Sequence, residues 1–380
     1  MNYEIKNIIS LLENLLQNNE YASYAQNIQI AIENLSNIYI TPPVISSQTQ
    51  EENFEYKEFA HSLSITGYYG FEETVKIPDM YHDKKITRIS GEAFHDCLNM
   101  KNLILGKYVD VIEHDAFRDC INLETVKIQS QLLFIGEGAF CNCTKLQHIN
   151  LPNTIHFIGD SAFCKTAIST ISIPTNLAFL SEMLFYGCKN LKHVSLHNNI
   201  VAIGKSAFSA CVSLNEIVLP PSVAVIYEGA FYDCTSLEKV TIFNPQVEIA
   251  WDAFDAQELE DDCNEDIIWP TPTLPNLTIY CLPKSTTQKY CRDRLIKTQK
   301  AEETTFSAPL SPSRLTDVIG FTFPKNKKKI DIIDTMYKYN LVVFEKHGGE
   351  FIFTSNSIEE PIAKPYKIKD YLENKRTKYY

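Results

Sequence analysis

The chain has 380 residues, of which 44% are hydrophobic and 22% charged, and its formal charge is −12 at pH 7. This composition is typical of a folded globular protein rather than a disordered one, and no segment is long and apolar enough to predict a membrane span. The acidic surplus argues against a general nucleic-acid binder, because such proteins need cations to replace the counterions around phosphates.

The first 40 residues predict a helical hairpin, because apolar residues recur at helical spacing from Ile5 to Leu16 and again from Ile28 to Ile38. Residues 41–57, with a proline pair and a Ser/Gln/Glu run, predict a linker. Acidic residues inside the first apolar stretch and the lack of a small-residue cleavage site argue against a signal peptide. A cytoplasmic location is therefore expected, with export to the cell surface by a non-classical route as the alternative.

A repeat of 23 residues governs the middle of the chain. A phenylalanine, usually preceded by alanine, returns every 23 residues with a single spacing of 22; the set is Phe94, Phe117, Phe140, Phe163, Phe185, Phe208, Phe231 and Phe254. Six residues after six of the first seven, and five residues after Phe163, comes Leu, Met or Ile, and then an alternating triplet such as Ile149-Asn150-Leu151, which predicts a short strand. One such unit cannot bury its apolar face alone, so stacking of about eight coils is expected.

These residues resemble the BspA-like leucine-rich-repeat family over about residues 60–292. The family's entry segment is matched from Leu63 to Ile89, and its last strand and closing helix are matched from Leu277 to Tyr290. The resemblance implies a β-rich leucine-rich-repeat solenoid with a right-handed coil, assigned to residues 58–297 with its entry strands and closing helix. Such proteins are adhesins, surface proteins or interaction modules, and the fold itself names no ligand.

Seven of the eleven cysteines are explained by the repeat. Six follow the repeat phenylalanine by three residues, Thr166 and Gln257 take that place in the other two coils, and Cys141 is a neighbour of this ladder. Free thiols packed as small apolar groups are expected, with disulfides or a metal as alternatives. Cys164 is expected to point outward. Three further cysteines lie outside the ladder, where any disulfide would be most plausible: Cys263, Cys281 and Cys291.

An apolar column precedes the isoleucine of each repeat, at positions where solvent-facing residues are usual. Its members, hereafter the apolar column, are Val111, Phe134, Phe157, Phe179, Ala202 and Val225. Leaving one of these phenylalanines in water would forgo about 1.5–3 kcal/mol of burial, so a cover is expected. The chain's own ends, an external protein partner and packing into the core are the three alternatives.

Two other features are candidates for partner binding. The outward residues of the predicted strands include His148 and His193, two coils apart and too distant to share a metal. After Phe254 the eighth coil contains about 14 inserted residues, and residues 255–269 hold seven acids and no Lys or Arg. A solvated loop, a basic partner and a calcium site are the alternatives there; the candidate contacts are Glu258, Glu260, Asp261 and Asp262.

Residues 298–313 predict a second linker, and residues 314–380 predict a small α+β unit. Within that unit, residues 328–339 suggest a helix, and residues 341–354 suggest a hairpin turning at His347-Gly348-Gly349. From residue 305 onward the chain carries 13 Lys and Arg against 9 Asp and Glu. The unit is interpreted as a solvated basic appendage, with nucleic-acid binding as the alternative.

No catalytic constellation is present in the sequence, so the expected function is that of a non-enzymatic protein-binding scaffold. A surface adhesin is the alternative, and a nucleic-acid or regulatory role of residues 314–380 is a second one. We expect a protein partner, no cofactor, no metal, no small-molecule substrate and no membrane insertion.

Overall fold

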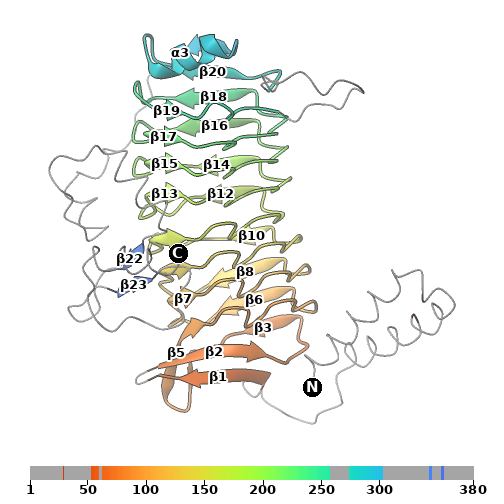
Figure 1. Ribbon diagram of the computed structural model, residues 1–380. Helices are drawn as coiled ribbons and strands as arrows, with labels where there is room; N and C mark the ends of the chain where they lie inside the picture. The colour runs from red at the N-terminus through yellow and green to blue at the C-terminus, as the bar shows by residue number, and fades with distance from the viewer. Residues whose placement is uncertain are drawn as a thin grey trace, which may run out of the picture.

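The computed structural model describes residues 53–59, 62–256 and 274–302, together with Gln29 and two short strands near the carboxyl end. In this part of the chain the backbone winds into an elongated solenoid of about ten turns, which confirms the architecture predicted from the repeat (Figure 1). Entry strands before the eight phenylalanine repeats, and a closing strand and helix after them, account for the additional turns.

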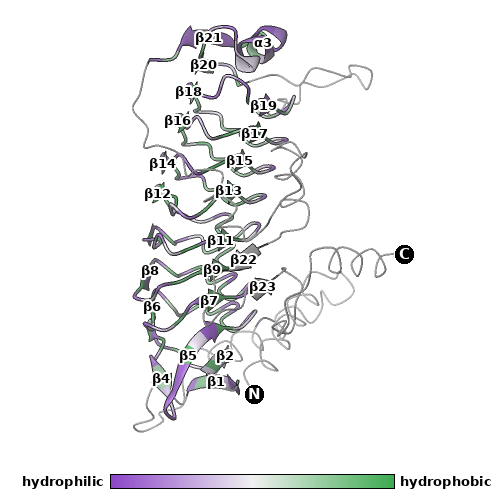
Figure 2. Ribbon diagram, turned by 90° about the vertical axis from the view of Figure 1, so that its left-hand side faces the viewer, coloured by the Kyte–Doolittle hydropathy of each residue, from purple (hydrophilic) through white to green (hydrophobic). Residues whose placement is uncertain are grey.

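Each coil contributes one strand to each of two stacks that flank the core (Figure 2). The first stack follows the leucine of each repeat, and its paired strands keep one register, so that Thr125 lies beside His148 and Glu216 beside Lys239. Its strands are β3 (Thr74–Lys76), β6 (Asn102–Leu105), β8 (Thr125–Ile128), β10 (His148–Ile149), β12 (Thr170–Ser172), β14 (His193–Ser195), β16 (Glu216–Leu219), β18 (Lys239–Ile242), β20 (Thr278–Cys281) and β21 (Lys297–Lys300).

The second stack contains the two-residue strands that carry the apolar column. In each of them the first residue pairs with the equivalent residue of the next coil, as Phe134 does with Phe157. These strands are β7 (Val111–Ile112), β9 (Phe134–Ile135), β11 (Phe157–Ile158), β13 (Phe179–Leu180), β15 (Ala202–Ile203), β17 (Val225–Ile226) and β19 (Glu248–Ile249). The stack continues toward the amino end through β5 (Lys84–Ile89) and β2 (Ser62–Tyr68).

The third side of each coil is the turn that carries the repeat phenylalanine. The residues two before and two after it have positive φ, such as Asp115 at 50° and Asp119 at 59° around Phe117. Aspartate, asparagine and glycine tolerate this left-handed conformation better than most residues, which explains their frequency here. The turn geometry lets Phe117 N–H donate to the Ala139 carbonyl of the next coil at 2.8 Å. The turns thus form a third hydrogen-bonded ladder.

Phenylalanine rings and cysteine thiols fill the core beside these turns. Successive repeat rings stack with centroids between 4.9 and 6.0 Å apart. The ladder thiols use a hydrogen bond that suits burial: Cys143 donates its S–H to the Phe117 carbonyl of the preceding coil at 3.1 Å. Thr166 takes the place of a ladder cysteine, with its hydroxyl 3.3 Å from Cys188 Sγ. Four more ladder cysteines are buried or half-buried: Cys97, Cys120, Cys211 and Cys234.

The first strand stack is interrupted between β14 and β16, and both stacks are interrupted together at one other place. Within residues 62–256, β10 does not pair with β12, and β11 does not pair with β13 (Figure 1). The interruption coincides with the single 22-residue repeat, from Phe163 to Phe185, whose rings have the widest spacing at 6.0 Å. The missing residue shifts the strands relative to each other, and a side chain replaces a backbone donor, since Ser181 Oγ donates to the Ile158 carbonyl. Only the turn ladder passes through this point unbroken.

The amino end of the solenoid is closed by antiparallel strands. β1 (Phe54–Glu58) pairs with β2, and β4 (Met80–Tyr81) pairs with β5. The ring of Phe54 lies 6.1 Å from that of Phe94, so β1 extends the aromatic core. This strand occupies part of residues 41–57, which were predicted to be a linker. Three of its five residues are charged, so the alternation of apolar and polar residues that would predict a strand is hidden.

The carboxyl end is closed by α3 (Thr286–Asp293) and β21. Ser285 caps the predicted closing helix, with its hydroxyl accepting from Gln288 N–H at 3.2 Å. β21 pairs with β20 and runs three residues into the predicted linker 298–313; its sequence is wholly polar, so only backbone pairing identifies it as a strand. A buried ion pair joins this end to the last coil, since Arg294 contacts Asp255 and both side chains are almost fully enclosed.

The predicted end units lie mostly outside the described residues. Of residues 1–40 only Gln29 is described, and it is helical. Of residues 314–380 only two strands are described, β22 (Val342–Phe344) and β23 (Ile352–Thr354), and they pair antiparallel as the predicted hairpin requires. In the described part of the chain, no helix has the length and apolar character needed to cross a membrane.

The ion pair that holds the closing helix gives the first prediction. Replacing Asp255 by Ala leaves the Arg294 cation buried without its counter-ion, which costs about 3–5 kcal/mol in comparable sites. We expect Asp255→Ala to lower the midpoint of thermal unfolding measured by circular dichroism. Asp252→Ala, three residues earlier and half-exposed, is the matched control and should change it little. Equal midpoints for the two variants would contradict the assigned role of the pair.

Candidate binding surfaces

The outward residues of the first stack form one polar column on the side of the solenoid. Because alternate residues of a strand point to opposite faces, Val126 and Ile149 enter the core while their neighbours face out. The column, hereafter the polar strand face, consists of Thr125, His148, Thr170, His193, Glu216 and Lys239; Thr125 is half-buried and the other five are exposed. The structure thus places both predicted histidines on one solvent-facing surface.

The polar strand face carries mixed charge. Lys239 Nζ lies 3.7 Å from Glu216 Oε2 and 5.4 Å from the ring centroid of Tyr280. An exposed ion pair of this kind contributes little to stability, about 0–1 kcal/mol, so it leaves both groups available to a partner. Thr125 Oγ1 donates to Asn102 Oδ1 at 2.8 Å, which orders the face near its amino end.

A second outward column runs parallel to the first and adds apolar contacts. On β16, β18 and β20 it contains Val218, Thr241 and Tyr280, which the strand register places side by side. Val218 is 40% exposed, one of few exposed large apolar residues in the described part of the chain. The sequence alone does not reveal this patch, because one valine in an alternating strand gives no signal until the register sets it in line with Thr241 and Tyr280.

The apolar column is buried. Phe157 is 1% exposed, Phe134 7% and Phe179 9%, and Ala202 and Val225 are also buried, whereas Val111 is half-buried. The rings stack, with the Phe134 and Phe157 centroids 5.1 Å apart.

The direction of the apolar column shows that it needs a cover. Ile135 and Ile158, the second residues of the same strands, belong to the core, so Phe134 and Phe157 face away from it. Packing into the core therefore does not explain their burial. The two covers predicted within the chain, residues 1–40 and 314–380, lie largely outside the described residues. Contact with a partner at this column stays a prediction.

The acidic insertion divides into a buried first residue and a remainder outside the described residues. Asp255 was counted with the acids of the insertion, but it is enclosed and pairs with Arg294, so it belongs to the core of the last coil. Distant pairing of this kind leaves no local pattern in the sequence. Four predicted contacts lie outside the described residues: Glu258, Glu260, Asp261 and Asp262.

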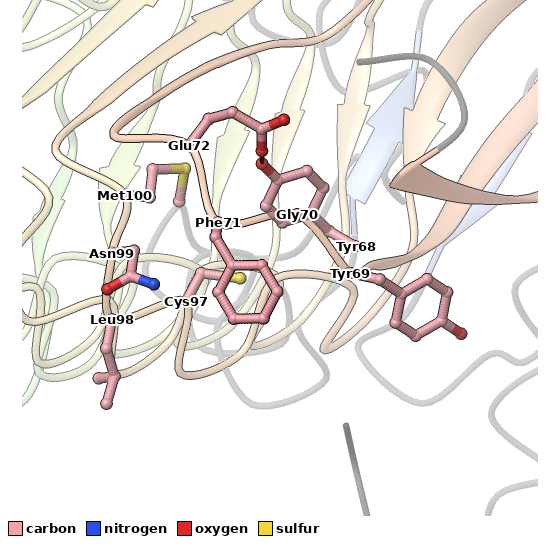
Figure 3. A pocket seen from close by; sticks show the side chains of 9 residues that line it. All are labelled: Tyr68, Tyr69, Gly70, Phe71, Glu72, Cys97, Leu98, Asn99 and Met100. Atoms are coloured by element: carbon pink, nitrogen blue, oxygen red, sulfur yellow. Dashed lines mark hydrogen bonds between the residues drawn. The ribbon is translucent and has the colours of Figure 1, made fainter. Parts of the chain in front are cut away.

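A small pocket lies at the amino end, between β2 and the first repeat turn (Figure 3). Its one charged lining residue is Glu72, and both carboxylate oxygens are already used. Asn53 Nδ2 donates to one at 2.9 Å, and the Tyr68 hydroxyl donates to the other. Burial and the contact with Glu72 raise the pKa of Tyr68 well above its ordinary value, so the phenol keeps its proton. This pocket closes the first coil rather than offering groups to a ligand.

The ten cysteines in the described part of the chain are free thiols. Cys281 and Cys291, which the sequence left as candidates for a disulfide, are both buried, and burial raises the pKa of each thiol. Cys164 was expected to point outward, but it is 5% exposed and contacts Cys141. Among the described residues, no three or more His, Cys, Asp or Glu side chains gather closely enough to hold a metal ion.

Comparison with known proteins finds a family match and several similar structures. The model of the BspA type leucine rich repeat region matches in six copies over residues 64–191 and 158–262. A leucine-rich repeat protein from Bacteroides ovatus is 22% identical, with 63% of this chain and 71% of that chain covered and a TM-score of 0.45. The T. pallidum leucine rich repeat protein is 19% identical, with 68% and 100% covered and a TM-score of 0.30. The comparison with curated proteins finds no match.

The burial of the apolar column gives the second prediction. Phe157→Ser removes a buried ring and should lower the midpoint of thermal unfolding, with a cost of about 3–5 kcal/mol by analogy with large-to-small core changes. If an end of the chain is the cover, limited proteolysis should release that end faster in the variant than in the wild type. Thr170→Ser, on the exposed stack of the neighbouring coil, is the control. An unchanged midpoint and an unchanged digestion pattern would show that the column is not a buried contact.

Proposed function

Because this chain belongs to the family of proteins with BspA type leucine rich repeats, we propose that it is a non-enzymatic scaffold that binds a protein through its polar strand face. The family and the solenoid define the scaffold; the ligand class and the surface are our proposal. One observation carries it: outward side chains of paired strands stand in register on a hydrogen-bonded support, five of the six are exposed, and the ion pair among them is weak.

The support is held by backbone hydrogen bonds between coils, through the turn ladder along the phenylalanine repeats and through strand pairing in both stacks except at the interruptions. A partner that contacts the strands therefore meets groups whose positions are set before binding, which lowers the entropy cost of association. Side chains on adjacent strands are about 4.8 Å apart, so a protein surface of ordinary size spans several coils. Curved solenoid faces of repeat proteins are commonly used in this way.

The chemistry of the face favours a protein over other ligands. Hydroxyl, imidazole, carboxylate and ammonium groups alternate along it, which suits a partner of mixed charge rather than a polyanion. Protein interfaces usually centre on a few apolar or aromatic anchors within a polar rim. Val218 and Tyr280 supply such an anchor, with Lys239 and Glu216 as neighbours. We place the centre of the contact on β16, β18 and β20.

Site-specific photo-crosslinking in the native cells tests this proposal. A photoreactive residue is introduced at Val218 or at His193 on the face, and at Lys189, an exposed turn residue, as the control. We expect an adduct of the same partner mass from both face positions and none from the control. Thermal unfolding of each variant verifies the fold. Adducts from Lys189 alone, or none from either face position, would contradict binding at this face.

A negative charge introduced at the anchor refines the same prediction. Val218→Glu places a carboxylate in the proposed centre and should lower the affinity for the crosslinked partner by tenfold or more, about 1.4 kcal/mol, in a titration with purified proteins. Asn190→Glu adds the same single negative charge at an exposed turn position away from the face and should leave the affinity unchanged. Equal affinities of the two variants for the partner would show that Val218 is not part of the contact.

A further inference from the structure

Cys141 and Cys164 occupy the same place in successive coils. Each follows a repeat phenylalanine, and the rings of Phe140 and Phe163 are parallel within 3° with centroids 5.6 Å apart. The backbones beside the two cysteines are hydrogen-bonded, since Asn142 N–H donates to the Cys164 carbonyl at 2.8 Å. The two side chains therefore leave neighbouring backbones in the same direction, at a separation within the range that disulfides bridge.

The ladder cysteines have the same coil spacing but a different environment. Cys120 and Cys143 are fully buried, and each donates its S–H to a backbone carbonyl at 3.1 Å. Burial raises the pKa of Cys120 well above its ordinary value. The Cys120 thiol therefore keeps its proton, and both thiols direct their S–H toward a backbone carbonyl inside the core, so we expect this part of the ladder to be inert.

Cys141 and Cys164 instead use their thiols on each other. The pKa of Cys141 is lowered to about 7, chiefly by the hydrogen bond from Cys164 and to a smaller extent by the nearby Arg118 guanidinium, while burial and the carboxylates of Asp119 and Asp115 oppose this lowering. The same contact raises the pKa of Cys164 well above its ordinary value, and burial is the second cause of this increase. One sulfur is thus a thiolate for much of the time near neutral pH, and its partner keeps a proton.

The pair lies just beneath the surface. Cys141 is 7% exposed and Cys164 5%, while Arg118 and Lys165 beside them are exposed. Arg118 is itself paired with Asp115 and Asp119, and the charges of these carboxylates oppose its effect on Cys141. A small oxidant can reach the sulfur of Cys141 from this edge of the coil. Nothing in the core packing requires cysteine here, since the equivalent positions of the next two coils are Tyr186 and Ser209.

We propose that Cys141 and Cys164 are a modification site, a dithiol that a hydroperoxide converts into a disulfide between adjacent coils. The Cys141 thiolate attacks the peroxide oxygen, the O–O bond breaks, and a sulfenic acid forms as water leaves after protonation. The Cys164 sulfur then attacks the Cys141 sulfur, an S–S bond forms, and a second water leaves. Two thiols and one hydrogen peroxide thus give one disulfide and two waters.

The bond would connect the solenoid where its strand stacks are interrupted. Cys141 precedes β10 and Cys164 precedes β12, and these two successive strands do not pair. His148 and Thr170 of the polar strand face stand on either side of this interruption. A disulfide would add a covalent link between the two coils. It would thereby restrict the movement of His148 relative to Thr170 across the interruption of the polar strand face.

Oxidation of the full chain tests the proposal. The reduced protein is treated with one equivalent of hydrogen peroxide, alkylated and digested, and mass spectrometry maps the linked peptides. We expect one Cys141–Cys164 disulfide; fragment ions distinguish Cys141 from Cys143, which trypsin leaves on the same peptide. The initial rate should rise as the pH increases through about 7, because the thiolate is the nucleophile. Oxidation should also raise the midpoint of thermal unfolding, and a reductant should reverse this.

Three variants distinguish the specific formation of this disulfide from unspecific oxidation of thiols by peroxide. Cys164→Ser should abolish the cross-link and leave Cys141 as a sulfenic acid, and Arg118→Met should slow the formation of the wild-type cross-link severalfold at pH 7. Cys143→Ala, in the inert ladder, should leave the rate of Cys141 oxidation unchanged. Equal oxidation of Cys120 and Cys143 in the wild type, failure of Cys141 to react before the protein unfolds, or an unchanged unfolding midpoint after oxidation would overturn the proposal.

Discussion

The structure depends on backbone hydrogen bonding between successive coils. No coil can satisfy its own amides and carbonyls, and an unpaired buried backbone group costs free energy comparable to a lost hydrogen bond. Each coil therefore needs a neighbour of the same length, so that strands and turns meet in register. The 23-residue period expresses this constraint. Phenylalanine and cysteine return in step because equivalent positions of successive coils stand above one another and share one environment.

This dependence explains how much could be predicted from the sequence. The core strands and the phenylalanine and cysteine ladders follow from periodicity, because each position is constrained in the same way many times. The residues at the two ends of the solenoid, by contrast, have no equivalent positions elsewhere in the chain, so no repeated pattern reveals their structure. β1 and β21 pair through backbone groups that any polar sequence provides, so their residues were assigned to linkers. Asp255 and Arg294 meet across 39 residues, and Cys164 finds Cys141 only when the coils are stacked.

The single 22-residue repeat shows why coils of equal length are needed for strand pairing. With one residue fewer between Phe163 and Phe185, the turn ladder persists while both strand stacks are interrupted. The turn tolerates the change because the deletion lies after it, between Thr166 and Ile168, on the way to the strand. Side chains compensate in part, as the hydroxyl of Ser181 does toward Ile158. At this place neither stack pairs its strands and the turn ladder alone provides backbone hydrogen bonds between the two coils, so a covalent bond would reinforce a junction with few other links.

The two outward columns differ in what the fold demands of them. Burial of the apolar column contributes to stability, so a change there is expected to affect folding before it affects recognition. The polar strand face has no such obligation, since its residues are exposed and its one ion pair is weak. Exposed positions on a rigid ladder can vary without loss of the fold, and such positions can be adapted to a partner. For this reason we assign recognition to the polar strand face and support of the molecule to the apolar column.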